Sequence, residues 1–182
     1  GFQLVGGSVQ LLPDFQGGAG ITNLVLDGVT LSGTNTVTGN LTFRSGSLGG
    51  VLLIAPGATF AIEGASAKTL SAIVTNRGTL NLSGTGDVNF TGTLDNEALF
   101  NLAGDVRMYP TFGEVRPLRN SGVIRKTSGT GTAELGVASS YFIALTNSGT
   151  IESLSGTISH FGGGLIDGLL KTTNGTRIDF TG

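Results

Sequence analysis

Residues Leu145 to Ile158 read LTNSGTIESLSGTI, and the first half of this stretch returns along most of the chain. The recurring pattern is an Asn, two small residues, a Thr and an aliphatic residue. Close and looser copies are LRNSGVI (118–124), VTNRGTL (74–80), LDNEALF (94–100), IAPGATF (54–60), VLDGVTL (25–31) and TTNGTRI (172–178). Aligned on the Asn position, the copies are anchored at Asp27, Pro56, Asn76, Asn96, Asn120, Asn147 and Asn174.

The intervals between these anchors are 29, 20, 20, 24, 27 and 27 residues. A repeat of this length, with strand-like alternation and no helical periodicity, is typical of a solenoid. Short apolar runs alternate with Thr, Asn and Ser and are bounded by Gly, which indicates short strands. The repeat therefore predicts an all-β fold, a single right-handed parallel β-helix of about seven coils with 20–29 residues each.

The aligned copies also predict which positions face the interior. Two residues before the anchor the column is apolar, with Val25, Ile54, Val74, Leu94, Leu118 and Leu145. Four residues after it the column is again apolar, with Leu31, Phe60, Leu80, Phe100, Ile124, Ile151 and Ile178. Alternation places the residues three and five positions after the anchor outside. Stacked coils should then bring opposite charges together in the pairs Arg77–Glu97, Asp95–Arg119 and Arg125–Glu152.

Composition limits the partners of the chain. Charged residues make up only 12% of the 182 residues, and the net charge is −2, so the basic surface typical of a nucleic-acid-binding protein is not expected. The chain has no cysteine, which excludes disulfides and thiolate metal sites. No apolar run reaches the length of a membrane-spanning helix. We expect no nucleic-acid partner, no membrane insertion and no cofactor.

We expect one solenoid domain over residues 1–182. Residues 1–20 form an irregular N-terminal unit, residues 21–161 hold the core repeats, and residues 162–182 form a last coil. Because the chain begins with Gly1 and shows no signal peptide, we interpret it as a fragment of a longer chain. The segment Asp105–Pro117, which holds two of the four prolines, predicts a longer excursion between coils, with a smaller break at Leu135–Tyr141.

The succession of GNLTFRSGSLGG, APGATFAI, TNRGTLNLSG, LRNSGVIRKTSGTGTAEL and LTNSGTIESLSGTI resembles the "NSGT" repeat regions of large bacterial surface proteins. Those regions are similar to autotransporter passengers and haemagglutinin-type adhesins, which are right-handed parallel β-helices. The resemblance covers about residues 21–161. It implies a secreted or cell-surface location in bacteria and an adhesive or structural role, while β-helices also host polysaccharide enzymes.

The repeated Asn is interpreted as structural. Asn tolerates a left-handed corner, and stacked amides can hydrogen-bond along a solenoid. The predicted structural row is Asn76, Asn96, Asn120, Asn147 and Asn174. A hydrogen-bonding array for a sugar is the alternative reading of the same residues.

No catalytic constellation emerges from the sequence, so no catalytic or metal-binding residues are predicted and the chain is expected not to be an enzyme. Enzymes on β-helices need clustered carboxylates with a basic residue. Only Asp95 and Glu97 alternate on one strand face, and both have a basic neighbour in the predicted register. His160 is the only histidine, and it is interpreted as an exposed turn residue.

The segment from Asp105 to Lys126 collects five basic residues and two aromatic residues, which makes it the best candidate for a groove that binds an anionic glycan. The candidate contacts, including a third aromatic residue from the smaller break, are Arg107, Tyr109, Phe112, Arg116 and Tyr141.

The sequence thus favours a non-catalytic structural or adhesive extracellular module. Its expected partners are neighbouring repeats or further copies of itself, stacked end to end into a filament, and glycans. The alternatives are a carbohydrate-active β-helix, a lyase or hydrolase, and a glycan-binding module without chemistry.

Overall fold

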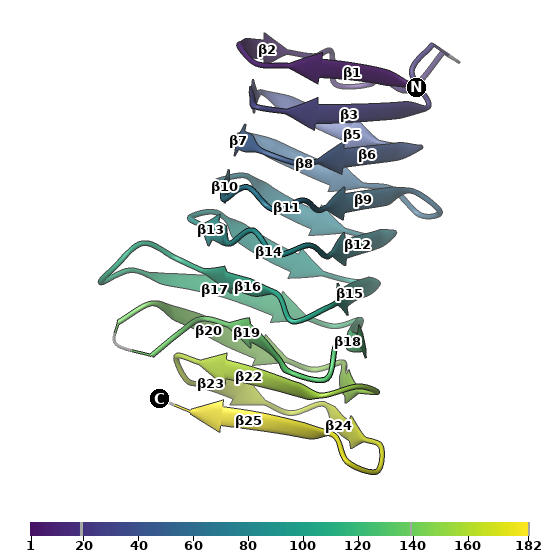
Figure 1. The fold of residues 1–182 in the computed structure, drawn as a ribbon. Coiled ribbons are helices and arrows are strands. Elements are labelled where there is room, and N and C mark those ends of the chain that lie inside the picture. Colours follow the sequence, from purple (N-terminus) through teal and green to yellow (C-terminus); the bar gives the residue numbers. More distant parts are fainter. Residues whose placement is uncertain (19, 139, 182) are drawn as a thin grey trace.

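The chain winds as a right-handed parallel β-helix with three sheets along its sides (Figure 1). The structure, a computed structural model, describes residues 1–18, 20–138 and 140–181. Within these residues there are strands and turns but no helix. The fold class predicted from the repeat is therefore confirmed.

Each coil contributes successive strands to sheets A, B and C, and all neighbouring strands in a sheet run parallel. Sheet A contains β1 (Phe2–Val5), β3 (Asn23–Asp27), β6 (Asn40–Phe43), β9 (Thr59–Ile62), β12 (Thr79–Leu82), β15 (Leu99–Ala103), β18 (Val123–Ser128), β21 (Thr150–Ser153) and β24 (Leu169–Thr172). Sheet B contains β2 (Ser8–Gln10), β4 (Val29–Ser32), β7 (Gly46–Leu48), β10 (Lys68–Leu70), β13 (Val88–Phe90), β16 (Arg107–Tyr109), β19 (Thr132–Leu135), β22 (Thr157–Phe161) and β25 (Arg177–Thr181). Sheet C contains β5 (Thr34–Val37), β8 (Val51–Ile54), β11 (Ile73–Asn76), β14 (Thr93–Asn96), β17 (Val115–Asn120), β20 (Phe142–Asn147) and β23 (Gly164–Ile166).

The helix has about nine coils, two more than the sequence predicted. In sheet A, equivalent positions on successive strands are Phe2, Leu24, Leu41, Phe60, Leu80, Phe100, Ile124, Ile151 and Leu170. The coils therefore contain 17–27 residues, whereas the predicted range was 20–29. The predicted unit from Asp27 to Pro56 had merged two short coils, and residues 2–10, in the range expected to be irregular, contribute β1 and β2.

The register error has a physical cause. Asp27 ends a strand of sheet A, and Asn174 lies in the turn between β24 and β25, whereas Asn76 ends a strand of sheet C. The outer copies of the repeat therefore occupy a different corner of the coil. Because all corners need small, polar turn residues, their sequences are alike. Consequently Leu31 and Ile178 face inward from sheet B, Val25 lies in sheet A, and Ile54 aligns with Asn76.

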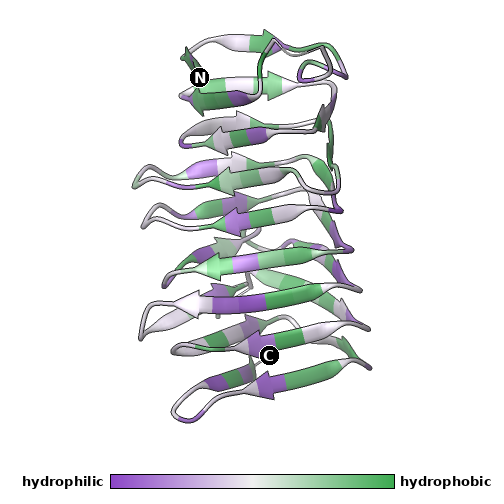
Figure 2. Ribbon diagram, turned by 90° about the vertical axis from the view of Figure 1, so that its right-hand side faces the viewer, coloured by the Kyte–Doolittle hydropathy of each residue, from purple (hydrophilic) through white to green (hydrophobic). Residues whose placement is uncertain are grey.

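The middle of the predicted pattern is confirmed. Phe60, Leu80, Phe100, Ile124 and Ile151 align in sheet A, and Val74, Leu94, Leu118 and Leu145 align in sheet C. All nine side chains are buried. Burial of one such side chain contributes roughly 1.5–3 kcal/mol, so these columns are a main source of stability. Figure 2 shows hydrophobic and hydrophilic residues following one another along individual strands.

Close approach between coils fixes some corner residues. Gly50 lies between β7 and β8 with φ +79°, and a Cβ there would collide with the carbonyl oxygen of Gly33 in the preceding coil. Only glycine combines a favourable positive φ with the absence of a Cβ atom. Corners of this kind let the next strand stack directly on the previous coil.

Two loops project sideways from the column of coils, on the left of Figure 1, where β16 leads to β17 and β19 leads to β20. The first loop falls within the predicted excursion Asp105–Pro117, although its flanking residues belong to β16 and β17. The second falls within the predicted break at Leu135–Tyr141. The loops are joined by a hydrogen bond from Gly113 N to Ser140 O at 2.9 Å.

Candidate functional site

A row of buried amides runs along the end of sheet C. Asn76 donates through Nδ2 to Asn96 Oδ1, Asn96 donates to Asn120, and Asn120 donates to Asn147, each at 2.6 Å. All four side chains are at most 1% exposed. The amides also donate to backbone carbonyls at the next corner, as Asn76 does to Leu99 O at 2.8 Å. The row is inaccessible to a ligand and holds four coils together.

Two details of the predicted row differ from the structure. Asn174 does not belong to it: the residue is exposed in a turn, and Ile166 occupies the next position after Asn147. None of the Asn residues in the row adopts the left-handed conformation, because Ser140 is the one non-glycine residue with positive φ among those described. The amide is therefore retained for its inward hydrogen bonds.

The three predicted ion pairs between coils are present. Arg77 lies 2.8 Å from Glu97, Arg119 lies 3.0 Å from Asp95, and Arg125 lies 2.7 Å from Glu152. Nine of the twelve acidic side chains lie within ion-pair distance of a basic one: Glu63, Asp87, Asp95, Glu97, Asp105, Glu114, Glu134, Glu152 and Asp179. The charges of the surface are thus largely compensated locally.

The basic residues between Asp105 and Lys126 do not form one groove. Arg107 is on sheet B, Arg119 is on sheet C, and Arg125 is on sheet A. Lys126 points inward and is fully buried, with Nζ bound to Asp105 Oδ1 at 2.8 Å and to the carbonyl oxygens of Ser128 and Gly129. A continuous anionic-glycan groove built from these five residues is therefore not formed.

The three predicted aromatic contacts do come together, at the base and tips of the projecting loops. The rings of Tyr109 and Tyr141 meet edge to face with centroids 5.6 Å apart, and those of Phe112 and Tyr141 meet likewise at 5.5 Å. Phe112 remains 66% exposed. With Asn89, Pro110 and Thr111, these rings line a hollow of about 330 Å³.

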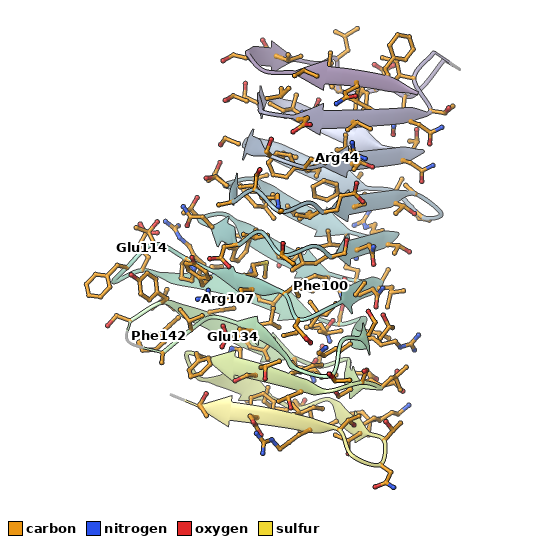
Figure 3. The ribbon with its side chains drawn as sticks, viewed as in Figure 1. Arg44, Phe100, Arg107, Glu114, Glu134 and Phe142 are labelled. Carbon is orange, nitrogen blue, oxygen red and sulfur yellow. The ribbon has the colours of Figure 1, made fainter. Side chains whose placement is uncertain are left out.

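Arg107 is held beside this cluster by acidic neighbours. Its guanidinium lies 5.2 Å from the centre of the Tyr109 ring, 2.8 Å from Glu134 and 3.4 Å from Asp87. Figure 3 shows Arg107 and Glu134 close together on one face, with Glu114 out on the projecting loop. The two carboxylates neutralise the one predicted basic contact that lies against the rings.

The hydroxyl of Tyr109 is also engaged, because it donates to Asp87 Oδ2 at 2.9 Å. Burial and this hydrogen bond to Asp87 raise the pKa of Tyr109 above its usual value of 10.0. The ring therefore carries no charge at neutral pH. The remaining predicted contact, Arg116, pairs with Glu114 at 2.7 Å and does not line the hollow.

Asp95 and Glu97, the one pair of alternating carboxylates, line a second hollow of about 520 Å³ on the outside of sheet C. Arg119, Ser121, Thr146 and Ser148 also line it. Both carboxylates are bound to arginine side chains, Asp95 to Arg119 and Glu97 to Arg77. Each of the two carboxylates thus has a cationic partner in the folded chain.

His160 was predicted to be an exposed turn residue, and this is wrong. It lies in β22 with its side chain in the core, only 3% exposed, and Nε2 donates to Ile143 O at 2.7 Å. Burial lowers the pKa of His160 below 6.5, although the hydrogen bond to Ile143 opposes this. The error concerned exposure, because His160 belongs to β22 itself, which ends at Phe161, and not to the turn that follows.

Lys68 is a second buried lysine, with a different environment. It is 2% exposed in the inward column of sheet B, between Gly46 and Val88, and its Nζ has no hydrogen-bond partner among the described residues. Burial lowers the pKa of Lys68 below 10.5, opposed by the charges of Asp87 and Glu63. No sequence motif marks this position.

Among the residues described, no three His, Cys, Asp or Glu side chains cluster in a way that could hold a metal ion. The same part of the chain includes no helix of the length and apolarity that spanning a membrane requires.

The sequence did not point to Asn89, which lines the hollow, or to Asp87, which binds the hydroxyl of Tyr109. Asp87 and Asn89 reach the aromatic cluster because β13 pairs with β16, which places Asn89 beside Tyr109. A register counted from Asn76 and Asn96 through the next strands would have found this pairing. Without that register, the 20 residues that separate Asn89 from Tyr109 in the sequence conceal the contact.

A comparison with protein-family models, curated proteins and solved structures gave no match to this chain.

Proposed function

We propose that this chain is a non-catalytic structural and adhesive module of a bacterial surface or secreted protein, and that copies of it stack end to end into a filament. The observation that carries the proposal is that apolar side chains of the inward columns are left exposed at both ends of the β-helix. Inward columns continue to the terminal coils, where Phe2, Leu170 and Phe180 are 58%, 43% and 42% exposed.

The ends are complementary in geometry. The outermost strands β1 and β2 at one end and β23, β24 and β25 at the other each have one neighbour in their sheet. All strand pairs are parallel, so the strands at the C-terminal end of one copy run in the same direction as those at the N-terminal end of the next. The two ends could therefore pair as neighbouring coils do. Unpaired parallel edges with apolar cores favour such head-to-tail addition, which produces open filaments rather than closed rings when the rotation does not close.

The absence of catalysis in this proposal is supported by the compensated carboxylates and by their dispersion over three sheets. The extracellular location is supported by the resemblance of the repeats to bacterial surface proteins, by the low content of charged residues and by the lack of cysteine. The aromatic hollow favours a glycan as the target of adhesion.

Negative-stain electron microscopy of the purified chain over a concentration series tests the filament. We expect filaments of the width of one or a few β-helices, which become longer with concentration. Phe180→Asp places a charge on the C-terminal end face and should abolish them, whereas Phe112→Asp, exposed on a side loop, should not. Dispersed particles at every concentration, or filaments that both variants preserve, would contradict end-to-end stacking.

A further inference from the structure

The aromatic hollow has the features of a built binding site. It is formed by two loops from different coils, and these loops are joined by the hydrogen bond from Gly113 N to Ser140 O. Ser140 has a φ of +88°, a conformation that is costly for a residue with a Cβ and is common at binding sites. The strained residue directly precedes Tyr141, the central ring of the cluster. The surrounding fold thus holds Tyr141 in a set position.

Each ring has a distinct situation. Tyr109 is covered by the Arg107 guanidinium and held by Asp87, so it forms the fixed wall of the hollow. Tyr141 contacts both other rings by edge-to-face packing. Phe112 has most of its surface in solvent and lies in the loop between β16 and β17. Because the Phe112 and Tyr141 rings are inclined by 72°, a flat ligand face can stack on Phe112 alone, with Tyr141 and Tyr109 lining the sides of the site.

The chemistry of the lining selects among ligands. Apart from the rings and Pro110, the hollow presents the amide of Asn89 and the hydroxyl of Thr111, and none of its lining residues is charged. The nearby Arg107 is neutralised by Asp87 and Glu134. An anionic ligand would lose hydration without gaining an unpaired cation. A ligand with an apolar face and a rim of hydroxyl groups matches both the rings and the uncharged polar groups.

We propose that this hollow binds an uncharged pyranose unit of a glycan, with Phe112 as the stacking surface and Tyr141 as the adjoining wall. The sequence alone favoured an anionic glycan, and the local neutralisation of Arg107 reverses that preference. A volume of about 330 Å³ is at the lower end for ligand sites, which suits one sugar ring rather than a long bound segment. A single ring binds weakly, but copies repeated along a filament would raise the avidity by multivalency.

This inference deepens the adhesive part of the proposed function and is independent of filament formation. The chain supplies its own reporter: it contains no tryptophan and two tyrosines, Tyr109 and Tyr141, both of which line the hollow. Tyrosine fluorescence of the wild-type chain, at concentrations below filament formation, can be titrated with cellohexaose, maltohexaose and N-acetylchitohexaose. Hexagalacturonic acid serves as the anionic comparison.

We expect at least one neutral oligosaccharide to change the tyrosine emission in a saturable way, independently of salt concentration. Phe112→Ala should weaken this binding about tenfold or more, as expected for loss of a central aromatic contact. Leu154→Ala, a change at an exposed apolar residue in the turn after β21, is the control and should leave the binding unchanged.

Several results would overturn the proposal. These are no response to any neutral oligosaccharide, equal affinity of Phe112→Ala and the wild type, or a response to hexagalacturonic acid alone that disappears with salt. Sedimentation velocity provides a further arm, because a self-association lost in Phe112→Ala would identify the hollow as a contact between copies. If sugar binding fails while filaments form, the stacking proposal stands. If sugar binds while no filaments form, the binding proposal stands.

Discussion

The side-chain amide of Asn96 donates a hydrogen bond of 2.6 Å to Oδ1 of Asn120, one coil further along, and both side chains are buried. Asn120 in turn donates to Asn147. An interior Asn in this row thus accepts a hydrogen bond from the preceding Asn through Oδ1 and donates one to the following Asn through Nδ2. This arrangement lets a polar residue repeat inside the core without leaving its polar groups unpaired.

Replacing Asn120 by Ala should destabilise the fold strongly. The change leaves Asn96 Nδ2 without its amide acceptor and Asn147 Oδ1 without its donor, in a site that water does not reach. Asn96 Nδ2 still donates to the carbonyl oxygens of Ala98 and Val123, so Asn147 Oδ1 is the group left unpaired. We expect a loss of about 1–3 kcal/mol in the free energy of unfolding. The midpoint of urea denaturation measures this loss.

Asn174→Ala is the matched control, because Asn174 is exposed in a turn outside the row. It should shift the midpoint by no more than about 0.5 kcal/mol in equivalent free energy. Equal losses for the two variants would show that the row has no special role.

The sequence predicted the central coils well because several signals coincide there. Between Asn76 and Asn147 the inward Asn, the flanking apolar columns and three pairs of opposite charge all specify one register. At the two ends only turn chemistry remained, and turns at different corners use the same small and polar residues. Asp27 and Asn174 were therefore assigned to the wrong corner, and about two coils were missed.

The candidate site was predicted by residue type but not by arrangement. Tyr109, Phe112 and Tyr141 stand out because aromatic residues are rare outside the core columns of this chain. That Arg107 would be neutralised by Asp87 could not be seen, because this contact depends on the pairing of β13 with β16. Buried Lys126 was also missed: it lies at a β-bulge in an inward column, between Leu102 of the preceding coil and Ser153 of the next.

The two buried lysines should respond in opposite directions to the same substitution. Lys126→Met removes the donor that binds Asp105 and the carbonyl oxygens of Ser128 and Gly129, and should cost about 2 kcal/mol. Lys68→Met removes a buried amine without a hydrogen-bond partner among the described residues and should stabilise the fold by about 1–2 kcal/mol at pH 7. Thermal unfolding of both variants under the same conditions compares them.

The effect of Lys68 also has a defined pH dependence. Because burial lowers its folded-state pKa below 10.5, the folded state binds a proton less readily than the unfolded chain. Stability is lost as the pH falls below about 10.5, so the advantage of Lys68→Met should be present at neutral pH, should shrink as the pH rises toward 10.5 and should be lost above that value. An advantage that grows with pH would contradict this assignment.

The ion pairs between coils should contribute little. In a double-mutant cycle with Asp95→Ala and Arg119→Ala, we expect a coupling energy of about 0.5 kcal/mol, because both side chains are partly exposed. The coupling should vanish at high salt, where exposed charges are screened. A coupling above about 2 kcal/mol would mean that these pairs stabilise the fold as well as match its register.

The buried His160 should make the C-terminal coils sensitive to mild acid. Its folded-state pKa is depressed below 6.5, so the unfolded chain takes up a proton first. The stability associated with neutral His160 is complete above about pH 6.5 and is lost as the pH falls toward the folded-state pKa. Protonation also places a charge against Phe180, whose ring centre lies 5.8 Å away, and between the buried Leu135 and the last strand.

His160→Gln isolates this effect, because an amide can still donate to Ile143 O but does not titrate in this range. Between pH 7 and pH 5 we expect the denaturation midpoint of the wild type to fall more than that of His160→Gln. Asp105, whose pKa is lowered by its hydrogen bond with Lys126, titrates at lower pH and does not contribute to this interval. Parallel curves for the two proteins over this interval would show that His160 is not the acid-sensitive group.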